Sequence, residues 1–211
     1  MAKELAKEIG YAYIDSGAMY RAVTLYCQQH HLIVDDQVND AALQKEIENI
    51  HIEFNVNPEN GKSETFLNGE NVENKIRSLA VSNQVSIVSS IGFVRKAMVR
   101  QQQAYNTSKG VVMDGRDIGT VVFPNAELKI FVTASPEIRA QRRYDELKQK
   151  GQEESYESIL ENVRKRDFMD QNRSESPLRK AEDAVELDNS RMSEEEQKKW
   201  LLDLFKEKTK E

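Results

Sequence analysis

Two aspartates and an arginine stand within four residues in the stretch DGRD, residues 114–117, directly after the apolar run VVM, residues 111–113. The apolar run predicts a short buried strand, so the charged residues fall at its carboxyl end. Open α/β sheets bind ligands at that edge. An arginine beside a carboxylate there can recognise a sugar hydroxyl or the edge of a base, whereas the same pair on an exposed surface contributes little.

Basic residues gather in two further segments that are expected to be helical. Arg142 and Arg143 lie in the first segment; in the second, steps of four and three residues place Arg166, Asp170 and Arg173 on one helix face. Guanidinium groups bind phosphates in a bidentate manner, and an aspartate between two arginines can also bind an amine or a hydroxyl. A solvated helix face with ion pairs gives the same pattern, so both interpretations stay open.

The composition narrows the class of protein. A chain of 211 residues with 38% apolar content can bury one core, or one core and a small lobe. The net charge of -6 disfavours a general binder of nucleic acid. A single cysteine, Cys27, excludes an internal disulfide framework. The sequence has neither an apolar run of membrane-spanning length nor a secretory leader, so we expect a cytoplasmic protein.

The scaffold that must position these residues alternates strands with helices. Helices are expected over residues 2–9, closed by Gly10, and over 18–30, 41–50, 73–89, 93–107, 136–150, 156–172 and onward from a capping box at 193–196. Strands are expected over residues 11–14, 111–113, 128–132 and 184–187, with a hairpin of residues 51–57 and 65–67 across a turn at 58–61. The alternation predicts a parallel sheet, and the hairpin marks an inserted lobe.

Several motifs, in this order along the chain, closely resemble those of bacterial cytidylate kinases. They are IDSGAMYR at 14–21, FLNG at 66–69, VS at 85–86 with VR at 94–95, DGRDIGTVVFP at 114–124 and the segment 166–173. The resemblance implies a P-loop nucleoside-monophosphate-kinase-like α/β fold: a parallel sheet with flanking helices, an inserted β-containing lobe that binds the monophosphate, and a helical lid. It implies transfer of a phosphoryl group from ATP to CMP or dCMP with Mg²⁺, by a monomer that binds neither nucleic acid nor membrane.

The resemblance also implies roles for individual residues. The acceptor nucleotide would contact Ser16, Tyr20, Arg21, Ser86, Arg95, Arg116, Asp117, Arg166 and Asp170. In this set Asp117 accepts from the exocyclic amine of cytosine, which uracil lacks, and Asp170 holds the ribose hydroxyls. The catalytic arginines would be Arg116, Arg142, Arg166 and Arg173. Arg142 and Arg143 would close over the ATP phosphates, and Asp114 would hold magnesium through water.

The same resemblance divides the chain into regions. The core would comprise residues 1–35, 91–135 and 176–211, the insertion residues 36–90 and the lid residues 136–175.

One departure from the family pattern concerns the ATP phosphates. The family begins with a strand and a loop of the form G-x-x-x-x-G-K-[ST], whose backbone amides and lysine hold those phosphates. The 211 residues contain no such loop, and residues 2–9 resemble the helix that follows it. We therefore expect the central strand and the loop to be absent, and this chain itself to be inactive. Two alternatives are a non-catalytic CMP-binding fragment or regulatory protein, and a kinase that also accepts UMP.

Overall fold

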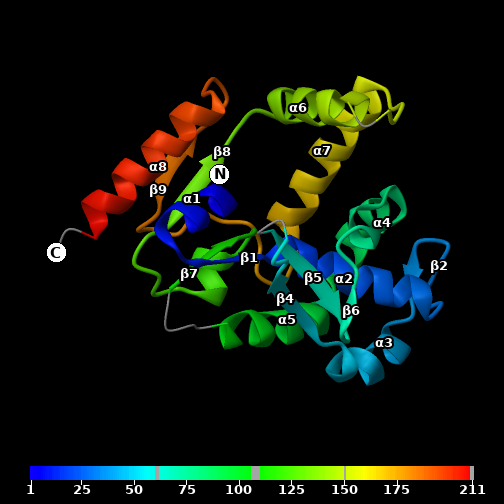
Figure 1. Ribbon diagram of the computed structural model, residues 1–211. Helices are drawn as coiled ribbons and strands as arrows, with labels where there is room; N and C mark the ends of the chain where they lie inside the picture. Colours follow the sequence, from blue (N-terminus) through cyan, green and yellow to red (C-terminus); the bar gives the residue numbers. More distant parts are fainter. Residues whose placement is uncertain (60–61, 106–109, 150, 210–211) are drawn as a thin grey trace.

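The computed structural model contains two pairs of parallel strands with helices around them (Figure 1). It describes residues 1–59, 62–105, 110–149 and 151–209. Strand β1 (Ala12–Asp15) pairs with β7 (Val111–Asp114), and β8 (Ile130–Thr133) pairs with β9 (Val185–Asp188). Within the described residues the two pairs are not hydrogen-bonded to each other. The predicted parallel strands are confirmed, but they form two separate ladders.

Two helices flank these strands and begin or end where the sequence predicts. Helix α1 (Ala2–Ile9) packs on β1 and β7 and ends at Gly10, whose φ of 74° is the left-handed conformation that glycine adopts readily. Helix α8 (Glu194–Lys208) contacts α1 and starts at Ser193, which forms the predicted capping box with Glu196.

The inserted lobe and the helices around it contain most of the buried apolar residues. The predicted hairpin is confirmed: β4 (Ile52–Val56) pairs antiparallel with β5 (Ser63–Leu67). Helices α2 (Ser16–Gln29), α4 (Leu79–Ser90) and α5 (Gly92–Ala104) pack with this hairpin in one hydrophobic cluster. The smaller elements are β2 (Ile33–Val34), β3 (Gln37–Val38), α3 (Asp40–Glu46), η1 (Ile47–Asn49), β6 (Glu70–Asn71) and η2 (Lys75–Arg77).

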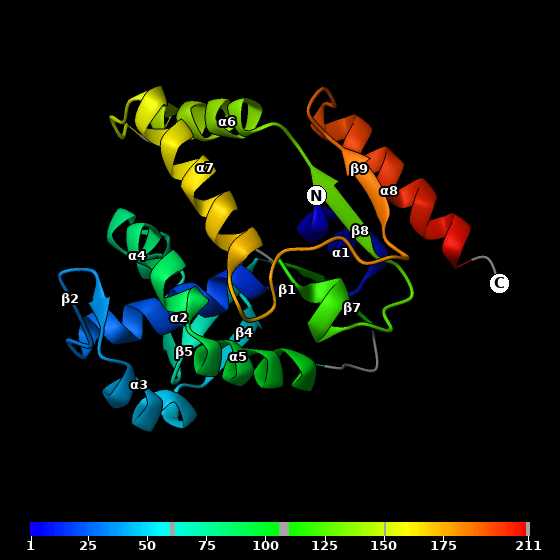
Figure 2. The same cartoon turned by 180° about the vertical axis from the view of Figure 1, so that it is seen from behind.

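A pair of helices forms a separate unit above the strands, as the view from behind shows (Figure 2). Helices α6 (Pro136–Gln149) and α7 (Tyr156–Asn172) pack on each other through a small apolar cluster that includes Ala140 and Ile159. Arg139 on α6 donates to both carboxylate oxygens of Asp167 on α7, at 2.7 and 2.6 Å. Helix α7 also contacts α4 of the lobe.

Some element boundaries differ from the predictions. The helix expected over 73–89 starts only at Leu79, because Ser78 caps it and the preceding residues form the turn η2. A π-helical turn, η3 (Ile118–Val122), follows β7 and was not predicted. Residues 60–61 of the predicted turn, residues 106–107 of the helix predicted over 93–107 and residue 150 of the helix predicted over 136–150 lie outside the described residues. In the described part of the chain, each helix is too short or too polar to cross a lipid bilayer.

Candidate active site

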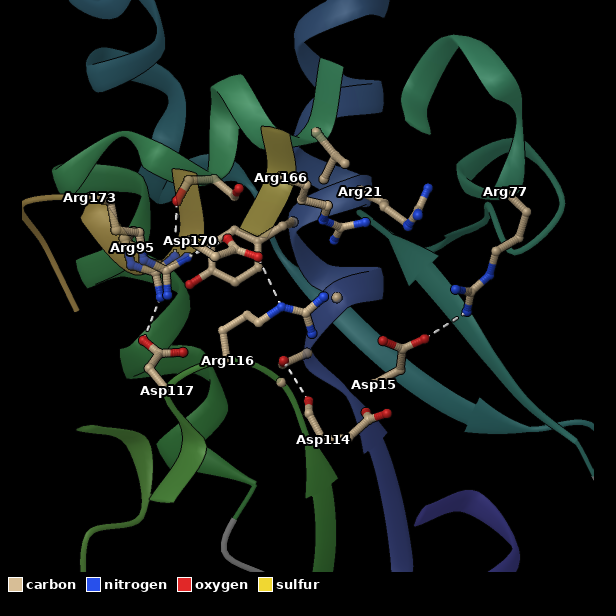
Figure 3. Close-up of a pocket in the computed structure, with 16 residues that line it drawn as sticks. Asp15, Arg21, Arg77, Arg95, Asp114, Arg116, Asp117, Arg166, Asp170 and Arg173 are labelled. Carbon is tan, nitrogen blue, oxygen red and sulfur yellow. Dashed lines mark hydrogen bonds and ion pairs between the residues drawn. The ribbon is translucent and has the colours of Figure 1, made fainter. Parts of the chain in front are cut away.

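A pocket of about 220 Å³ opens at the carboxyl ends of β1 and β7 (Figure 3). Helices α2, α4, α5 and α7 all contribute to its wall. Its charged lining residues are Arg21, Arg77, Arg95, Arg116, Arg166 and Arg173 with Asp15, Asp114, Asp117 and Asp170. Its other lining residues are Ser16, Gly17, Tyr20, Val85, Ser89 and Gly115. The pocket therefore combines many cationic groups with a smaller number of carboxylates, at the sheet edge where the sequence predicts a site.

The junction of β1 and α2 forms one wall of this pocket. Asp15 caps α2, because its Oδ1 accepts from the Ala18 amide at 2.9 Å. The Ser16 hydroxyl donates to the Asp114 carbonyl at 2.6 Å, and the Tyr13 hydroxyl donates to Asp114 Oδ1 at 3.1 Å. Asp15 and Asp114 are partners in the strand register. Burial, together with the charge of Asp15, raises the pKa of Asp114 to about 6.

A buried ion pair forms the floor beside α5. The Arg95 guanidinium pairs with Asp117 Oδ2, and these side chains are 1% and 4% exposed. Arg95 also donates to the Ser89 carbonyl at 2.9 Å and lies over the Tyr20 ring, 5.1 Å from its centre. Buried charges of this kind persist when they are paired and hydrogen-bonded, so the pair fixes the position of the Asp117 carboxylate.

Helix α7 brings a second carboxylate into the pocket between two arginines. Arg116 Nε donates to Asp170 Oδ2 at 2.9 Å, and Arg173 donates to Asp170 Oδ1 at 3.1 Å. The other terminal nitrogen of Arg173 is buried without a hydrogen-bond partner in the described part of the chain. Arg166 and Asp170 lie on one face of α7, as predicted, whereas Arg173 follows the end of the helix in extended backbone; all three line the pocket.

Positive charge is crowded where α2 and α7 approach each other. Burial, with the charges of Arg166 and Arg77, lowers the pKa of Arg21 to about 10. Burial, followed by the charge of Arg116, likewise lowers the pKa of Arg166. A bound anion relieves such crowding, so this part of the pocket is suited to a phosphate group.

The structure brings most of the predicted site residues together. The pocket lining includes Ser16, Tyr20, Arg21, Arg95, Asp114, Arg116, Asp117, Arg166, Asp170 and Arg173. Ser86 is not among the lining residues; the same helix contributes Val85 and Ser89 instead.

The two predicted lid arginines of α6 lie outside the pocket lining. Arg142 donates to Asn189 after β9, to the side-chain oxygen at 3.1 Å and to the carbonyl at 2.7 Å. Arg143 pairs with Glu146 at 3.1 Å, and its charge also contributes to the lowered pKa of Arg21 and of Arg166. Arg143 therefore acts electrostatically on the same region as the pocket arginines.

Sequence reasoning missed two charged lining residues. Asp15 has no role assigned from the sequence beyond its place in the motif at 14–21, and Arg77 lies 62 residues further along the chain. Arg77 reaches the pocket through an ion pair with Asp15 at 2.9 Å. No local pattern distinguishes Arg77 from other surface arginines, because its partner is close only in the folded chain.

The carboxylates at the ends of β1 and β7 are the candidate ligands for a magnesium ion. No group of three or more metal-ligating side chains occurs among the residues that the structure describes. Asp114 nevertheless presents a carboxylate at the pocket edge beside Asp15, and burial, followed by the charge of Asp15, raises its pKa. Magnesium is often held by one or two carboxylates with water and phosphates, and Asp114 fits that pattern.

Comparison with known proteins identifies the family of this chain. A family model described as cytidylate kinase matches residues 1–207. The chain belongs to the cytidylate kinase family. The cytidylate kinase of Bacteroides thetaiotaomicron is 62% identical over 211 residues, which cover 100% of this chain and 92% of that protein. The cytidylate kinase of Bacteroides fragilis is 63% identical over 202 residues, 96% of this chain and 88% of that protein. The cytidylate kinase of Porphyromonas gingivalis is 55% identical over 210 residues, 99% and 91% of the two chains.

Proposed function

We propose that this protein transfers the terminal phosphoryl group of ATP to CMP or dCMP, giving CDP or dCDP. The observation that carries the proposal is the pocket of six arginines and four aspartates in a chain of the cytidylate kinase family. The excess of arginines over aspartates corresponds to the charge of a phosphate monoester, which approaches a dianion at neutral pH. Family membership disfavours a purely regulatory role.

The acceptor nucleotide is recognised at three positions in this proposal. Asp117, held by Arg95, accepts a hydrogen bond from the exocyclic amine of cytosine. Asp170, held by Arg116 and Arg173, binds the ribose hydroxyls. Arg21 and Arg166 bind the phosphate, which relieves the charge crowding that lowers the pKa of both. Because a site that pairs with an amine rejects an analogue lacking it, CMP and dCMP are preferred over UMP.

The donor side rests on positioning and charge neutralisation. Phosphoryl transfer passes through a loose transition state with charge spread over oxygens, so arginines act without a strong general base. Arg116, Arg166 and Arg173 stabilise the charge that develops on the transferred group, and Arg142 and Arg143 of the α6–α7 lid bind the ATP phosphates. Asp114 would hold a magnesium ion through water, and the ion would supply positive charge that neutralises the phosphate oxygens.

We also propose that one more parallel strand, followed by a glycine-rich phosphate loop, completes the sheet between β7 and β8. The two strand pairs are not joined to each other within the described residues. Val111, Val112 and Met113 are only partly buried, and Val132 is 46% exposed. Strands of parallel sheets are normally covered on both faces and paired on both edges. Such a loop is not among these 211 residues, so the chain as printed has little kinase activity.

We retain two further proposals that concern the whole molecule. The core comprises residues 1–35, 91–135 and 176–211, the insertion residues 36–90 and the lid residues 136–175. The protein is a cytoplasmic monomer that does not bind nucleic acid, for which the net charge of -6 is the support.

Two measurements test the function. Isothermal titration calorimetry with CMP, dCMP and UMP tests the acceptor site, and the absence of CMP binding, or equal affinity for UMP, contradicts it. A coupled assay of ADP release compares this chain with one extended upstream through a glycine-rich loop. Turnover is expected from the extended chain alone. Comparable turnover by the two chains contradicts the donor-site proposal.

A further inference from the structure

We propose that Glu73 and Arg77 form a positioning bridge, which fixes the first turn of α2 against the inserted lobe and so orients Ser16 and Arg21 in the acceptor site. This inference rests on the proposed function, because it assigns the bridge a role in binding CMP. Neither Glu73 nor Arg77 was identified as a site residue from the sequence.

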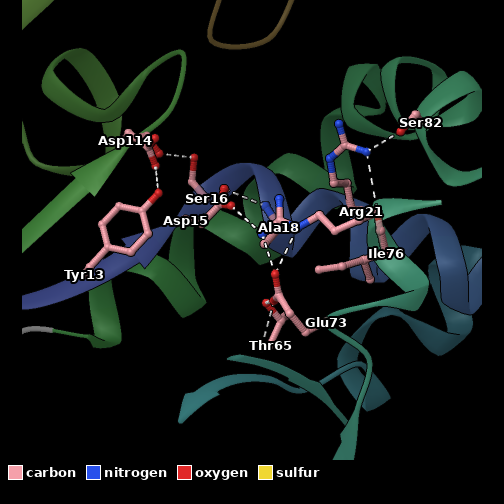
Figure 4. Close-up of polar contacts among 11 residues, drawn as sticks. Tyr13, Asp15, Ser16, Ala18, Arg21, Thr65, Glu73, Ile76, Ser82 and Asp114 are labelled. Atoms are coloured by element: carbon pink, nitrogen blue, oxygen red, sulfur yellow. Dashed lines mark hydrogen bonds and ion pairs between the residues drawn. The ribbon is translucent and has the colours of Figure 1, made fainter. Parts of the chain in front are cut away.

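The bridge is a continuous series of polar contacts from the lobe to the strand end (Figure 4). Glu73 Oε2 accepts from the amide and the hydroxyl of Thr65 on β5, at 3.1 and 2.7 Å. Glu73 Oε1 accepts from Arg77 Nε at 3.0 Å. A terminal nitrogen of Arg77 then donates to Asp15 Oδ2 at 2.9 Å. Two carboxylates and one guanidinium therefore connect β5 with the end of β1.

Both ends of the bridge are anchored. Thr65 is 1% exposed and its strand pairs with β4, so Glu73 is fixed to a buried part of the lobe. At the other end Asp15 divides its two oxygens, since Oδ1 caps α2 at Ala18 and Oδ2 accepts from Arg77. Loss of Arg77 frees the Asp15 carboxylate to rotate, which weakens the cap of the helix that carries the acceptor residues.

Arg21 makes a second connection, which runs from α2 to the lobe. Arg21 of α2 donates to the Ser82 hydroxyl at 2.8 Å and approaches the Ile76 carbonyl at 3.4 Å. The first turns of α2 are therefore attached to the lobe at two points, and Arg77 and Arg21 both line the pocket. Glu73 is not among the lining residues, so any effect of Glu73 on a bound nucleotide must pass through Arg77.

The bridge also places a cation beside the two carboxylates at the strand ends. Asp15 and Asp114 are neighbouring carboxylates in the strand register, and Arg77 is the cation paired with Asp15. Arg77 is itself 46% exposed. Exposed pairs contribute little to the free energy of unfolding, whereas small displacements of binding groups have large effects on ligands. Loss of the bridge is therefore expected to weaken CMP binding and to raise the mobility of the first turn of α2, with little effect on the free energy of unfolding.

The test uses Glu73→Gln, Arg77→Gln and the double variant. The control is Arg100→Gln, because Arg100 pairs with Glu48 in an exposed ion pair outside the pocket lining. In calorimetry each single variant should weaken CMP binding about fivefold to tenfold, and the double variant no further than Arg77→Gln alone. Thermal melting should stay close to that of the wild type, and the control should match the wild type in all measurements.

Amide hydrogen exchange of the ligand-free protein provides a readout that does not depend on CMP. Exchange in the first turn of α2, at Ala18 above all, should rise about fivefold in both single variants and not in the control. Wild-type CMP affinity in Glu73→Gln, additive losses in the double variant, or unchanged exchange at Ala18 would overturn the bridge. If the wild type binds no CMP while exchange rises as expected, the proposed function fails and the bridge itself is supported.

Discussion

Arg95 and Asp117 form an ion pair in the interior, although 22 residues separate them in the chain and they come from α5 and the end of the loop after β7. Because transferring two charges from water is costly, such a pair is a poor source of net stability. Its value is positional. Arg95 pairs with one oxygen of Asp117, in the pocket that Tyr20 and Ser89 also line, and in the proposed function the other oxygen accepts from cytosine.

The first prediction concerns this pair. Asp117→Asn keeps the shape of the side chain but leaves the Arg95 charge without a counter-ion, and a neutral amide oxygen accepts from the cytosine amine more weakly than a carboxylate does. We expect weaker CMP binding, a smaller preference for CMP over UMP, and a loss of up to about 3–5 kcal/mol in the free energy of unfolding. Calorimetry and urea denaturation measure these effects. The control is Glu48→Gln, which removes one partner of an exposed ion pair. An Asp117→Asn variant that prefers CMP over UMP as strongly as the wild type contradicts the assignment.

The second prediction concerns Arg166. Burial and neighbouring arginines already lower its pKa, so Arg166→Ala removes a charge from a crowded site and should leave the melting temperature nearly unchanged. Kinase activity of the upstream-extended chain should be lost, because the variant lacks a phosphate-binding cation. A coupled ADP-release assay and thermal melting are the measurements. A variant that melts early and retains normal activity would indicate a structural role for Arg166.

Local sequence patterns predicted the elements whose determinants are local. The left-handed glycine after α1, the capping box of α8 and the bounds of α7 depend on residues within a few positions of each other. The π-helical turn η3 was missed, since its backbone bonds from Val122 to Asp117 and from Phe123 to Ile118 have no side-chain signature. Arg77 was missed as a pocket residue because its partner Asp15 comes close only through the folding of the lobe.

The third prediction concerns the buried thiol. Cys27 lies on α2, and its side chain is fully buried in the hydrophobic core. Burial raises the pKa of its thiol to about 12. Since the thiolate is the reactive form, at pH 8 the native protein should react with an aromatic disulfide reagent at least about 100-fold more slowly than the protein in urea. The raised pKa also gives the sign of the pH effect. The contribution of the Cys27 thiol to the free energy of unfolding is complete below pH 9 and declines as the pH rises towards 12. Rapid modification of the native protein would place Cys27 at an accessible position.

The last prediction concerns the close approach of β7 and α2 at Gly115. A Cβ atom at Gly115 would lie 2.2 Å from Ser16 Oγ and 2.8 Å from the Ile118 side chain, so Gly115→Ala must displace the backbone or Ser16. Ser16 Oγ already donates to the Asp114 carbonyl at 2.6 Å, and that contact joins the two strand ends beneath the pocket. We expect a loss of about 1–3 kcal/mol in the free energy of unfolding from overpacking, and at least about tenfold weaker CMP binding.

Gly92→Ala is the matched control for this change. A Cβ atom there would approach only Glu175 at 3.9 Å, which is ordinary contact, and Gly92 begins α5, where alanine is favoured. Urea denaturation should therefore show Gly92→Ala to be as stable as the wild type or slightly more stable, with unchanged CMP affinity. If Gly115→Ala also keeps the wild-type CMP affinity, Ser16 and the Asp114 carbonyl do not form the shared edge of the acceptor pocket, and the nucleotide must bind without contact to that junction.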